Sequence, residues 1–342
     1  MECYKKIGLL FCAAIFLLQG CVINDLDDCP DAIRYALAFE YTLHTGENDR
    51  FAEDVDKMFI YAFDATTGIC VYADTTTLIA PFGKDYTYSL PLSMGKYDII
   101  TWGWGRNTGD VSLKMSTAVI PTIIPGTTSI DNARLLLEDK LNDGRLERTF
   151  YGERNVDVPA FVSRVDTVSL INITNQIRII IPDAKTAEIQ DRISVSIVGN
   201  NGAYYFKPGS NPPAMDVLKG GVTYLPYVMY RTDSVLVVDP ISKETYTGTG
   251  RDSMLIVEIS TLRLVQNDAN MQVVLDYGGN PVIFPLLEML QAGISSNIQY
   301  NLDKYYRWQL LFNITNTSVT VHIQTMDWHV VYQPSNAGGI LQ

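Results

Sequence analysis

The chain has 342 residues, carries a formal net charge of −12 at pH 7, and is 47% hydrophobic. The acidic balance argues against nucleic acid as a partner and fits an ectodomain. The length is more than one hydrophobic core usually holds, so two domains are expected. Twenty Tyr residues, many Thr, Val and Ile residues, and few long helical patterns indicate an all-β protein.

The first residues carry an export signal. Lys5 and Lys6 precede an apolar run, 7–18, which is shorter than the roughly 20 residues that a membrane-spanning helix needs. A basic start, an apolar run and a small residue define residues 1–20 as a secretory signal peptide. The Leu-Gln-Gly-Cys sequence that ends at Cys21 matches the bacterial lipobox. Cys21 is therefore expected to be acylated, and the alternative is an ordinary signal peptide with an incidental cysteine.

Residues 21–30 form the expected lipidated tether. Several acyl chains on Cys21 would hold the protein on a bilayer, because each buried methylene contributes about 0.8 kcal/mol. The acidic run at 24–28 is unlike a segment that lies on an anionic membrane. It resembles the acidic export signals of Bacteroidetes surface lipoproteins, and a solvated spacer is the alternative reading.

Signal cleavage leaves three cysteines, of which Cys21 carries the lipid. Cys29 and Cys70 are then the remaining thiols in an oxidising compartment, so we expect a disulfide between them. Two free, buried cysteines are the alternative.

Residues 31–160 are predicted to form the N-terminal β-sandwich. A clean period of two over 33–43 indicates a half-buried strand. Strands at 57–63 and 69–73 flank a Thr-Thr-Gly turn, which predicts a hairpin. Two further strands are expected at 86–92 and 97–104.

A helix is expected over 131–142, capped by Asp131 and ended by Gly144. The acidic residues near Asp143 do not have EF-hand spacing, so we predict a turn there and no metal site. The polar segment 146–165 suggests a domain junction near residue 160.

Residues 161–342 are predicted to form the C-terminal β-sandwich. Its strands are short and separated by turns, with one short helix at 285–291, and the final residues 333–342 show no period. Two successive sets of such strands indicate two β-sandwiches in tandem. The expected strands are 169–181, 193–198, 203–207, 222–230, 234–238, 254–264, 271–276, 306–314 and 319–323.

The sequence offers little support for an enzyme. It has no Gly-x-Ser-x-Gly, phosphate-loop or HExxH motif. His44, His322 and His329 have no cysteine or carboxylate at metal-ligand spacing, so neither a metal nor a cofactor is expected. Trp102 and Trp104 share one strand face, which fits either core packing or a sugar-stacking platform.

Four short patterns match the Asp-Ser/Thr-apolar or Asp-Thr-Thr sequences that Bacteroidetes use for O-glycosylation of exported proteins. Their acceptors are Thr75, Thr167, Ser234 and Ser253. Each is a three-residue pattern that also recurs by chance.

Several segments together resemble the Bacteroidales fimbrial anchor lipoproteins, the FimB-like and Mfa-type minor fimbrial subunits. These segments are the lipobox with Asp-Leu-Asp-Asp-Cys29-Pro30, the sequence Met58-Phe-Ile-Tyr-Ala-Phe-Asp64, and the strand that begins after Gly95-Lys-Tyr. Phe150-Tyr-Gly152 and the closing strand at 306–314 are similar to later landmarks of that family.

The resemblance implies two transthyretin-like β-sandwiches, lipid-anchored at the outer membrane and exposed at the cell surface. Its expected role is non-enzymatic: to anchor a fimbria, or to form a minor subunit of it, by binding a shaft subunit. In related pilins one chain's extended segment completes a neighbour's sheet. A surface glycan-binding lipoprotein and a secreted hydrolase are the alternatives. The first needs Trp102 and Trp104 exposed, and the second needs a cleft with convergent acids.

Overall fold

The computed structural model describes most of the chain from residue 35 onwards. The described residues are 35–44, 46, 48–74, 82–105, 113–116, 118–137, 140–160, 163–181, 193–206, 221–232, 234–235, 246–247, 254–266, 268–292, 297–314, 319–324 and 329–332. The predicted signal peptide, the predicted tether and residues 333–342 lie outside these ranges.

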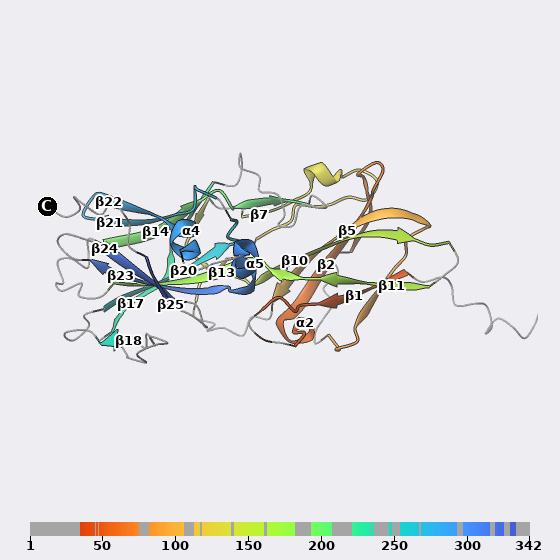
Figure 1. The fold of residues 1–342 in the computed structure, drawn as a ribbon. Coiled ribbons are helices and arrows are strands. Elements are labelled where there is room, and N and C mark those ends of the chain that lie inside the picture. The colour runs from red at the N-terminus through yellow and green to blue at the C-terminus, as the bar shows by residue number, and fades with distance from the viewer. Residues whose placement is uncertain are drawn as a thin grey trace, which may run out of the picture.

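Two sheets form the N-terminal sandwich, at the right-hand end of Figure 1. The smaller sheet has the order β11-β1-β4, built from Arg164–Ser169, Tyr35–Glu40 and Thr87–Leu90. The larger sheet has the order β12-β10-β5-β2-β3, built from Ile171–Asn172, Thr149–Val158, Gly95–Gly105, Val55–Asp64 and Cys70–Asp74.

Alternating burial explains why these residues pair as strands. In β1 the odd-numbered side chains Tyr35, Leu37 and Phe39 are buried while their neighbours are half-buried. This is the period of two that the sequence predicts. The β2–β3 hairpin is also confirmed: Asp64 accepts hydrogen bonds from the backbone N–H groups of its turn, and Gly68 has φ +68°, a conformation that favours glycine.

Two larger sheets form the C-terminal sandwich. One has the order β17-β20-β13-β23-β24-β25, built from Pro226–Thr232, Met254–Leu262, Thr174–Ile181, Arg307–Ile314, Val319–Gln324 and His329–Tyr332. The other has the order β22-β21-β14-β16-β8, built from Asn280–Pro285, Gln272–Tyr277, Ile193–Gly199, Val222–Tyr224 and Leu141–Asn142. Helix α4 spans Leu286–Gln291, close to the predicted position, and α5 spans Ile298–Lys304.

The helix predicted over 131–142 is wrong. Ser129 accepts a hydrogen bond from the Asp131 backbone and begins only a short 3-10 helix, Ile130–Asn132. The leucines that follow lie in β7, Arg134–Leu136, which pairs with β15, Ala203–Tyr205. Long-range pairing therefore overrides local helix propensity here. The remaining short elements are α2 at Phe51–Asp54, β6 at Met115–Ser116 with β9 at Arg145–Leu146, and β18 at Ser234–Val235 with β19 at Tyr246–Thr247.

Strand pairing does not change from one sandwich to the other at residue 160. The segment expected to be a junction contains β10, a ten-residue strand inside the larger N-terminal sheet. After residue 160, β11 and β12 still pair with β1 and β10, and the first strand of the C-terminal sandwich is β13 at Thr174. By pairing, the change of sandwich falls between Asn172 and Thr174, although β7 and β8 already pair with C-terminal strands.

The two sandwiches lie end to end and share one continuous core (Figure 1). The Phe206 ring, from the C-terminal half, lies 5.4 Å from the Trp102 ring and 5.5 Å from the Tyr61 ring, both in the N-terminal half. Near this junction, Arg263 Nε donates a 2.6 Å hydrogen bond to Asp303, and both side chains are buried. The all-β fold with two sandwiches in tandem is thus confirmed. Within the described part of the chain, no helix is long and apolar enough to cross a membrane.

Candidate functional site

Histidine chemistry has no support in the described residues. His44 is buried, its Nε2 lies 2.6 Å from the Asn48 carbonyl oxygen, and its Nδ1 accepts from Gly46 N–H at 2.8 Å. His322 and His329 lie on the paired strands β24 and β25. Across the described ranges, no group of three or more His, Cys, Asp or Glu side chains could hold a metal ion.

The two tryptophans of β5 do not form an exposed platform. Trp102 is 0% exposed, and its ring packs on the rings of Tyr151 and Phe206. Trp104 is 5% exposed and meets the Phe59 ring edge-on at 4.6 Å. A sugar stacks on an open ring face, so the platform expected for a glycan-binding surface is corrected to core packing for Trp102. Trp104 lies deep in a groove.

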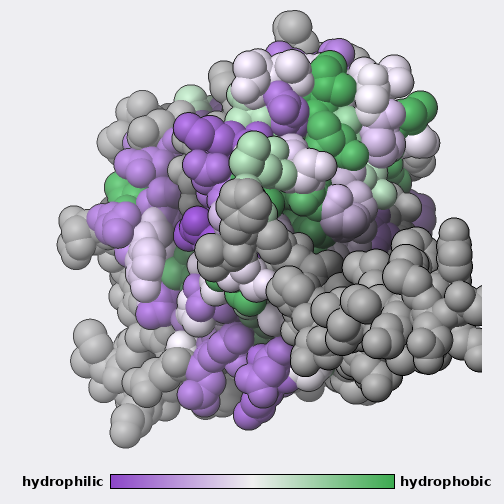
Figure 2. Space-filling view, turned by 90° about the vertical axis from the view of Figure 1, so that its right-hand side faces the viewer, coloured by the Kyte–Doolittle hydropathy of each residue, from purple (hydrophilic) through white to green (hydrophobic). Residues whose placement is uncertain are grey.

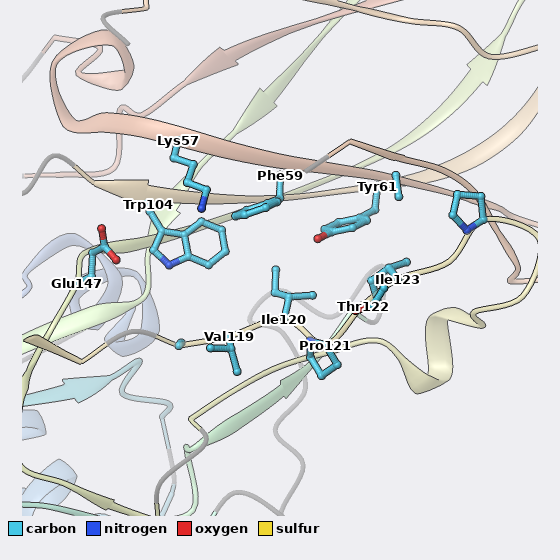
Figure 3. Close-up of a pocket in the computed structure, with 13 residues that line it drawn as sticks. Lys57, Phe59, Tyr61, Trp104, Val119, Ile120, Pro121, Thr122, Ile123 and Glu147 are labelled. Atoms are coloured by element: carbon cyan, nitrogen blue, oxygen red, sulfur yellow. The ribbon is translucent and has the colours of Figure 1, made fainter. Parts of the chain in front are cut away.

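That groove lies between the outer face of the larger N-terminal sheet and the segment 118–125, and has a volume of about 510 Å³ (Figure 3). Aromatic rings of Phe59, Tyr61 and Trp104 form the sheet side. Val119, Ile120 and neighbouring prolines form the opposite wall, which the bridge between Val119 and Leu136 holds in place. The groove therefore combines aromatic and aliphatic side chains with a similar share of polar surface.

Two side-chain nitrogen donors, from Lys57 and Trp104, lie in the lining of this groove. The Lys57 Nζ lies 4.6 Å from the centroid of the Phe59 ring and 5.9 Å from that of Trp104 (Figure 3). Such contacts hold an ammonium group over ring faces. The Trp104 Nε1 is buried and makes no hydrogen bond among the described residues. Glu147 is the carboxylate in the lining, and it already makes an interaction of its own.

One edge of β2 runs beside the groove. β5 pairs with β2 from Val55 to Asp64, but β3 pairs only with Ile60–Phe63 on the other side. Among the described residues no strand pairs with that side of 55–59.

The strand β1 is the first strand of the described residues. It is bonded on both sides, to β11 in parallel and to β4 in antiparallel orientation. At its start the Tyr35 hydroxyl donates a 2.9 Å hydrogen bond to Asp166, which also accepts from Arg164 at 2.9 Å. Burial alone would raise the pKa of Asp166, but the bonds from Arg164 and Tyr35 outweigh it and lower the pKa.

The predicted modification sites are only partly within the described residues. Cys21, Cys29, Thr75 and Ser253 lie outside them, so acylation and the disulfide stay predictions of the sequence. Cys70 carries a free thiol, 0% exposed, that donates to the Tyr72 carbonyl. Burial raises the pKa of this thiol to about 11. Thr167 is exposed on β11, and Ser234 begins β18.

Sequence reasoning missed the groove. Its lining comes from β2, β3, β5 and the segments before β7 and β10, and only the tertiary fold brings these together. One signal was available: Lys57 interrupts an apolar strand on the face that also carries Phe59 and Tyr61.

Comparison with known proteins identifies the relatives. The family model of fimbrillin-A associated anchor proteins matches residues 26–334. A crystal structure from Bacteroides thetaiotaomicron, described as a candidate polysaccharide-binding protein, is 20% identical, with a TM-score of 0.66 over 90% of this chain and 100% of that chain. The fimbrial anchor protein Mfa2 from Porphyromonas gingivalis is 16% identical, with a TM-score of 0.60 over 87% of this chain and 98% of that chain.

A candidate adhesin from Bacteroides ovatus is 17% identical, with a TM-score of 0.64 over 89% of this chain and 97% of that chain. At these identities the structures establish likeness of fold alone. A search of curated protein sequences found no match. The family match covers most of the chain and confirms the resemblance inferred from its motifs. The chain belongs to the family of fimbrillin-A associated anchor proteins Mfa1 and Mfa2.

Proposed function

We propose that this fimbrial protein is a surface-exposed outer-membrane lipoprotein, acylated at Cys21, that holds a shaft subunit of the fimbria by strand addition. The role is structural and involves no catalysis. The observation that carries the proposal is the position of β1, the first described strand after the tether.

The direction of β1 orients the two sandwiches relative to the lipid. β1 runs parallel to β11, and β11 leads through β12 into β13 of the C-terminal sandwich. The end of β1 therefore faces the C-terminal sandwich, while its start, Tyr35, lies towards the opposite end of the molecule (Figure 1). A lipid on Cys21 would thus leave the C-terminal sandwich pointing away from the membrane, where a shaft could extend.

The surface at the lipid-proximal end fits this arrangement. Viewed from that end, hydrophilic and hydrophobic residues are interspersed, with hydrophobic residues gathered towards the upper right of the view (Figure 2). The visible, described residues give no single apolar face that would insert into a bilayer. We therefore propose that the lipid on Cys21, and not a protein surface, attaches the protein to the membrane.

Strand addition explains how a protein without a catalytic site could hold another subunit. The edge strands of a β-sandwich carry backbone groups that can pair with an added strand. The final residues are a weaker donor, because only Ala337, Ile340 and Leu341 are apolar and a Gly-Gly pair precedes the last two. We therefore assign this protein the accepting role.

Replacing Cys21 with Ala tests the anchor. The variant protein, and with it the fimbriae, should move from the membrane fraction into the medium, while Cys29→Ala should leave both in place. Retention of Cys21→Ala in the membrane pellet after a high-salt wash would refute the lipid anchor.

Deleting residues 334–342 tests which side donates the strand. Unchanged attachment of fimbriae is expected if this protein accepts the strand. Fimbriae shed into the medium would mean that the tail is the donor.

A further inference from the structure

Helix α5 lies where the two sandwiches meet (Figure 1). Towards the N-terminal sandwich it lies against β12, whose Ile171 pairs with Tyr151 of β10. Towards the C-terminal sandwich it is hydrogen-bonded to the segment 263–266, which directly follows β20. One short helix therefore contacts both sandwiches.

A buried ion pair fastens α5 to this segment. Arg263 donates from Nε to one oxygen of Asp303 at 2.6 Å and from Nη2 to the other oxygen at 2.5 Å. The Arg263 side chain is 1% exposed and that of Asp303 is 7% exposed. Gln299 of α5 adds two bonds to the same segment, because its Nε2 donates to the Leu264 carbonyl oxygen and its Oε1 accepts from the Gln266 N–H. The helix is thereby held by directional bonds as well as by apolar packing.

Arg263 is in turn connected to both halves of the molecule. Its carbonyl oxygen accepts from Asn201 Nδ2 at 2.9 Å and from the hydroxyl of Tyr204 in β15 at 3.0 Å, and both of these side chains are fully buried. Its charge also acts on the N-terminal sandwich: burial raises the pKa of the Tyr151 hydroxyl, and the Arg263 guanidinium opposes that rise. The ion pair therefore lies at the contact between the two sandwiches.

A buried ion pair is not needed simply to hold two cores together. Both charges lose their hydration on burial, and apolar side chains of similar volume often stabilise a fold at least as well. Apolar contacts such as that of Phe206 with Trp102 have no preferred direction. Two parallel N–H···O bonds, in contrast, fix both the distance and the angle between their partners.

We infer that α5 is a clasp between the two sandwiches, and that the ion pair of Arg263 with Asp303 locks this clasp and fixes the relative orientation of the sandwiches. The direction in which the C-terminal sandwich points from the start of β1 is then set by one pair of side chains. This inference goes beyond the proposed function and does not depend on it.

Distance measurements between the sandwiches test the inference on the full-length chain purified in detergent. Spin labels are attached to non-canonical residues that replace Ser89 of β4 and Ile283 of β22, both of which are exposed. Double electron–electron resonance gives the distance distribution for the wild type and for Arg263→Met/Asp303→Leu, which removes both charges and leaves apolar side chains in their place. The wild type should give one narrow peak, and the variant should give a broader or displaced distribution.

Arg178→Met/Glu258→Leu is the matched control, because this ion pair joins β13 and β20 within one sheet. The control should keep the narrow peak of the wild type. A second pair of labels, at Met229 of β17 and Ile283, lies within the C-terminal sandwich at two exposed positions. Its distance should be the same in all three proteins, which shows that the C-terminal sandwich stays folded.

An unchanged narrow peak between the sandwiches of Arg263→Met/Asp303→Leu would overturn the inference, and so would equal broadening in the control. If this variant loses the distance between Met229 and Ile283, Asp303→Asn decides, because it keeps the shape of the side chain and one acceptor oxygen for Arg263. Its distribution between the sandwiches should be broader than that of the wild type, and a peak as narrow as that of the wild type would overturn the inference.

Discussion

Asp166 is expected to hold the start of β1, and replacing it with Ala should loosen the strand that follows the tether. The Asp166 side chain is 7% exposed, accepts from the Tyr35 hydroxyl and from Arg164 at 2.9 Å each, and lies 3.7 Å from Arg154. The variant leaves the buried Tyr35 hydroxyl without its acceptor, which costs about 1–3 kcal/mol. The two arginines are about half-exposed, so their pairs add only about 0.5 kcal/mol each. The expected loss is about 2–4 kcal/mol in the free energy of unfolding.

Urea unfolding followed by circular dichroism measures this loss, with Asp85→Ala as the control at an exposed carboxylate. A double-mutant cycle with Tyr35→Phe isolates the hydrogen bond. Removing both partners should cost about 1 kcal/mol less than the sum of the single variants. A loss under about 0.5 kcal/mol for Asp166→Ala, or strictly additive costs, would refute the assigned role.

The contacts of Asp166 also predict that the free energy of unfolding depends on pH. The pKa of Asp166 is lower in the folded protein than in the unfolded chain, where Asp titrates near about 3.9. Its contribution is therefore fully present above that value and is lost as the pH falls through the folded pKa. The stability difference between wild type and Asp166→Ala should be constant near pH 7 and shrink below about pH 4.

Three further outcomes follow from packing. Gly152→Ala should cost about 1–3 kcal/mol in unfolding free energy, because an added Cβ would lie 2.6 Å from Val168, whereas Gly83→Ala meets no atom within 4 Å and should be neutral. Phe206→Ala should cost about 3–5 kcal/mol and split the unfolding transition, because the ring joins the two halves. In the Cys29→Ala variant, where no Cys29–Cys70 disulfide can form, Cys70 should resist alkylation at pH 8 until urea is added, because its pKa is raised to about 11; rapid alkylation of the native variant would contradict the burial of Cys70.

Most strands could be predicted because their pattern reports burial directly. In β1 and in the β2–β3 hairpin, one face of each strand packs on a facing sheet or segment. The alternation of apolar residues and the turn residues are therefore enough to locate these strands from the sequence. The helix α4 was also found, because Gly293 and an apolar run bound it. The all-β class and the tandem sandwiches follow from many such strands.

The failures have a common physical cause, which is pairing between distant segments. β10 reads as a polar segment because Glu153 to Asn155 are polar, yet its ladder with β5 covers ten residues. The leucines of β7 suggest a helix, but β15 supplies a pairing partner about seventy residues later. No local pattern carries this information. The return of β11 and β12 to the N-terminal sheets is likewise a pairing between distant segments, which the composition near residue 160 does not report.

In the candidate site, too, features that depend on a local motif could be predicted, and features that depend on contacts between distant segments could not. The lipobox at Cys21 is a local motif, so the tether is predictable from the sequence alone, although it lies outside the described residues. The two tryptophans were visible as a pair, but their burial depends on Phe206 and on the segment 118–125. The groove depends on where the segment 118–125 lies against β2 and β5, which turn signals alone do not determine.

A fimbrial anchor of the proposed kind must carry load from its lipid to the shaft, and the fold supplies a continuous path for it. Force on the tether would pull the start of β1 along the strand, away from the C-terminal sandwich. β1 pairs with β11 at six positions and with β4 at four. A force along the axis of β1 would therefore act on all of these backbone hydrogen bonds at the same time, rather than breaking them one after another. From there β11 leads into β13, and Phe206 ties the core of one sandwich to the other. Resistance to such a pull is set by the unfolding barrier rather than by equilibrium stability. A strand held on both sides is therefore suited to follow the segment that is proposed to carry the lipid.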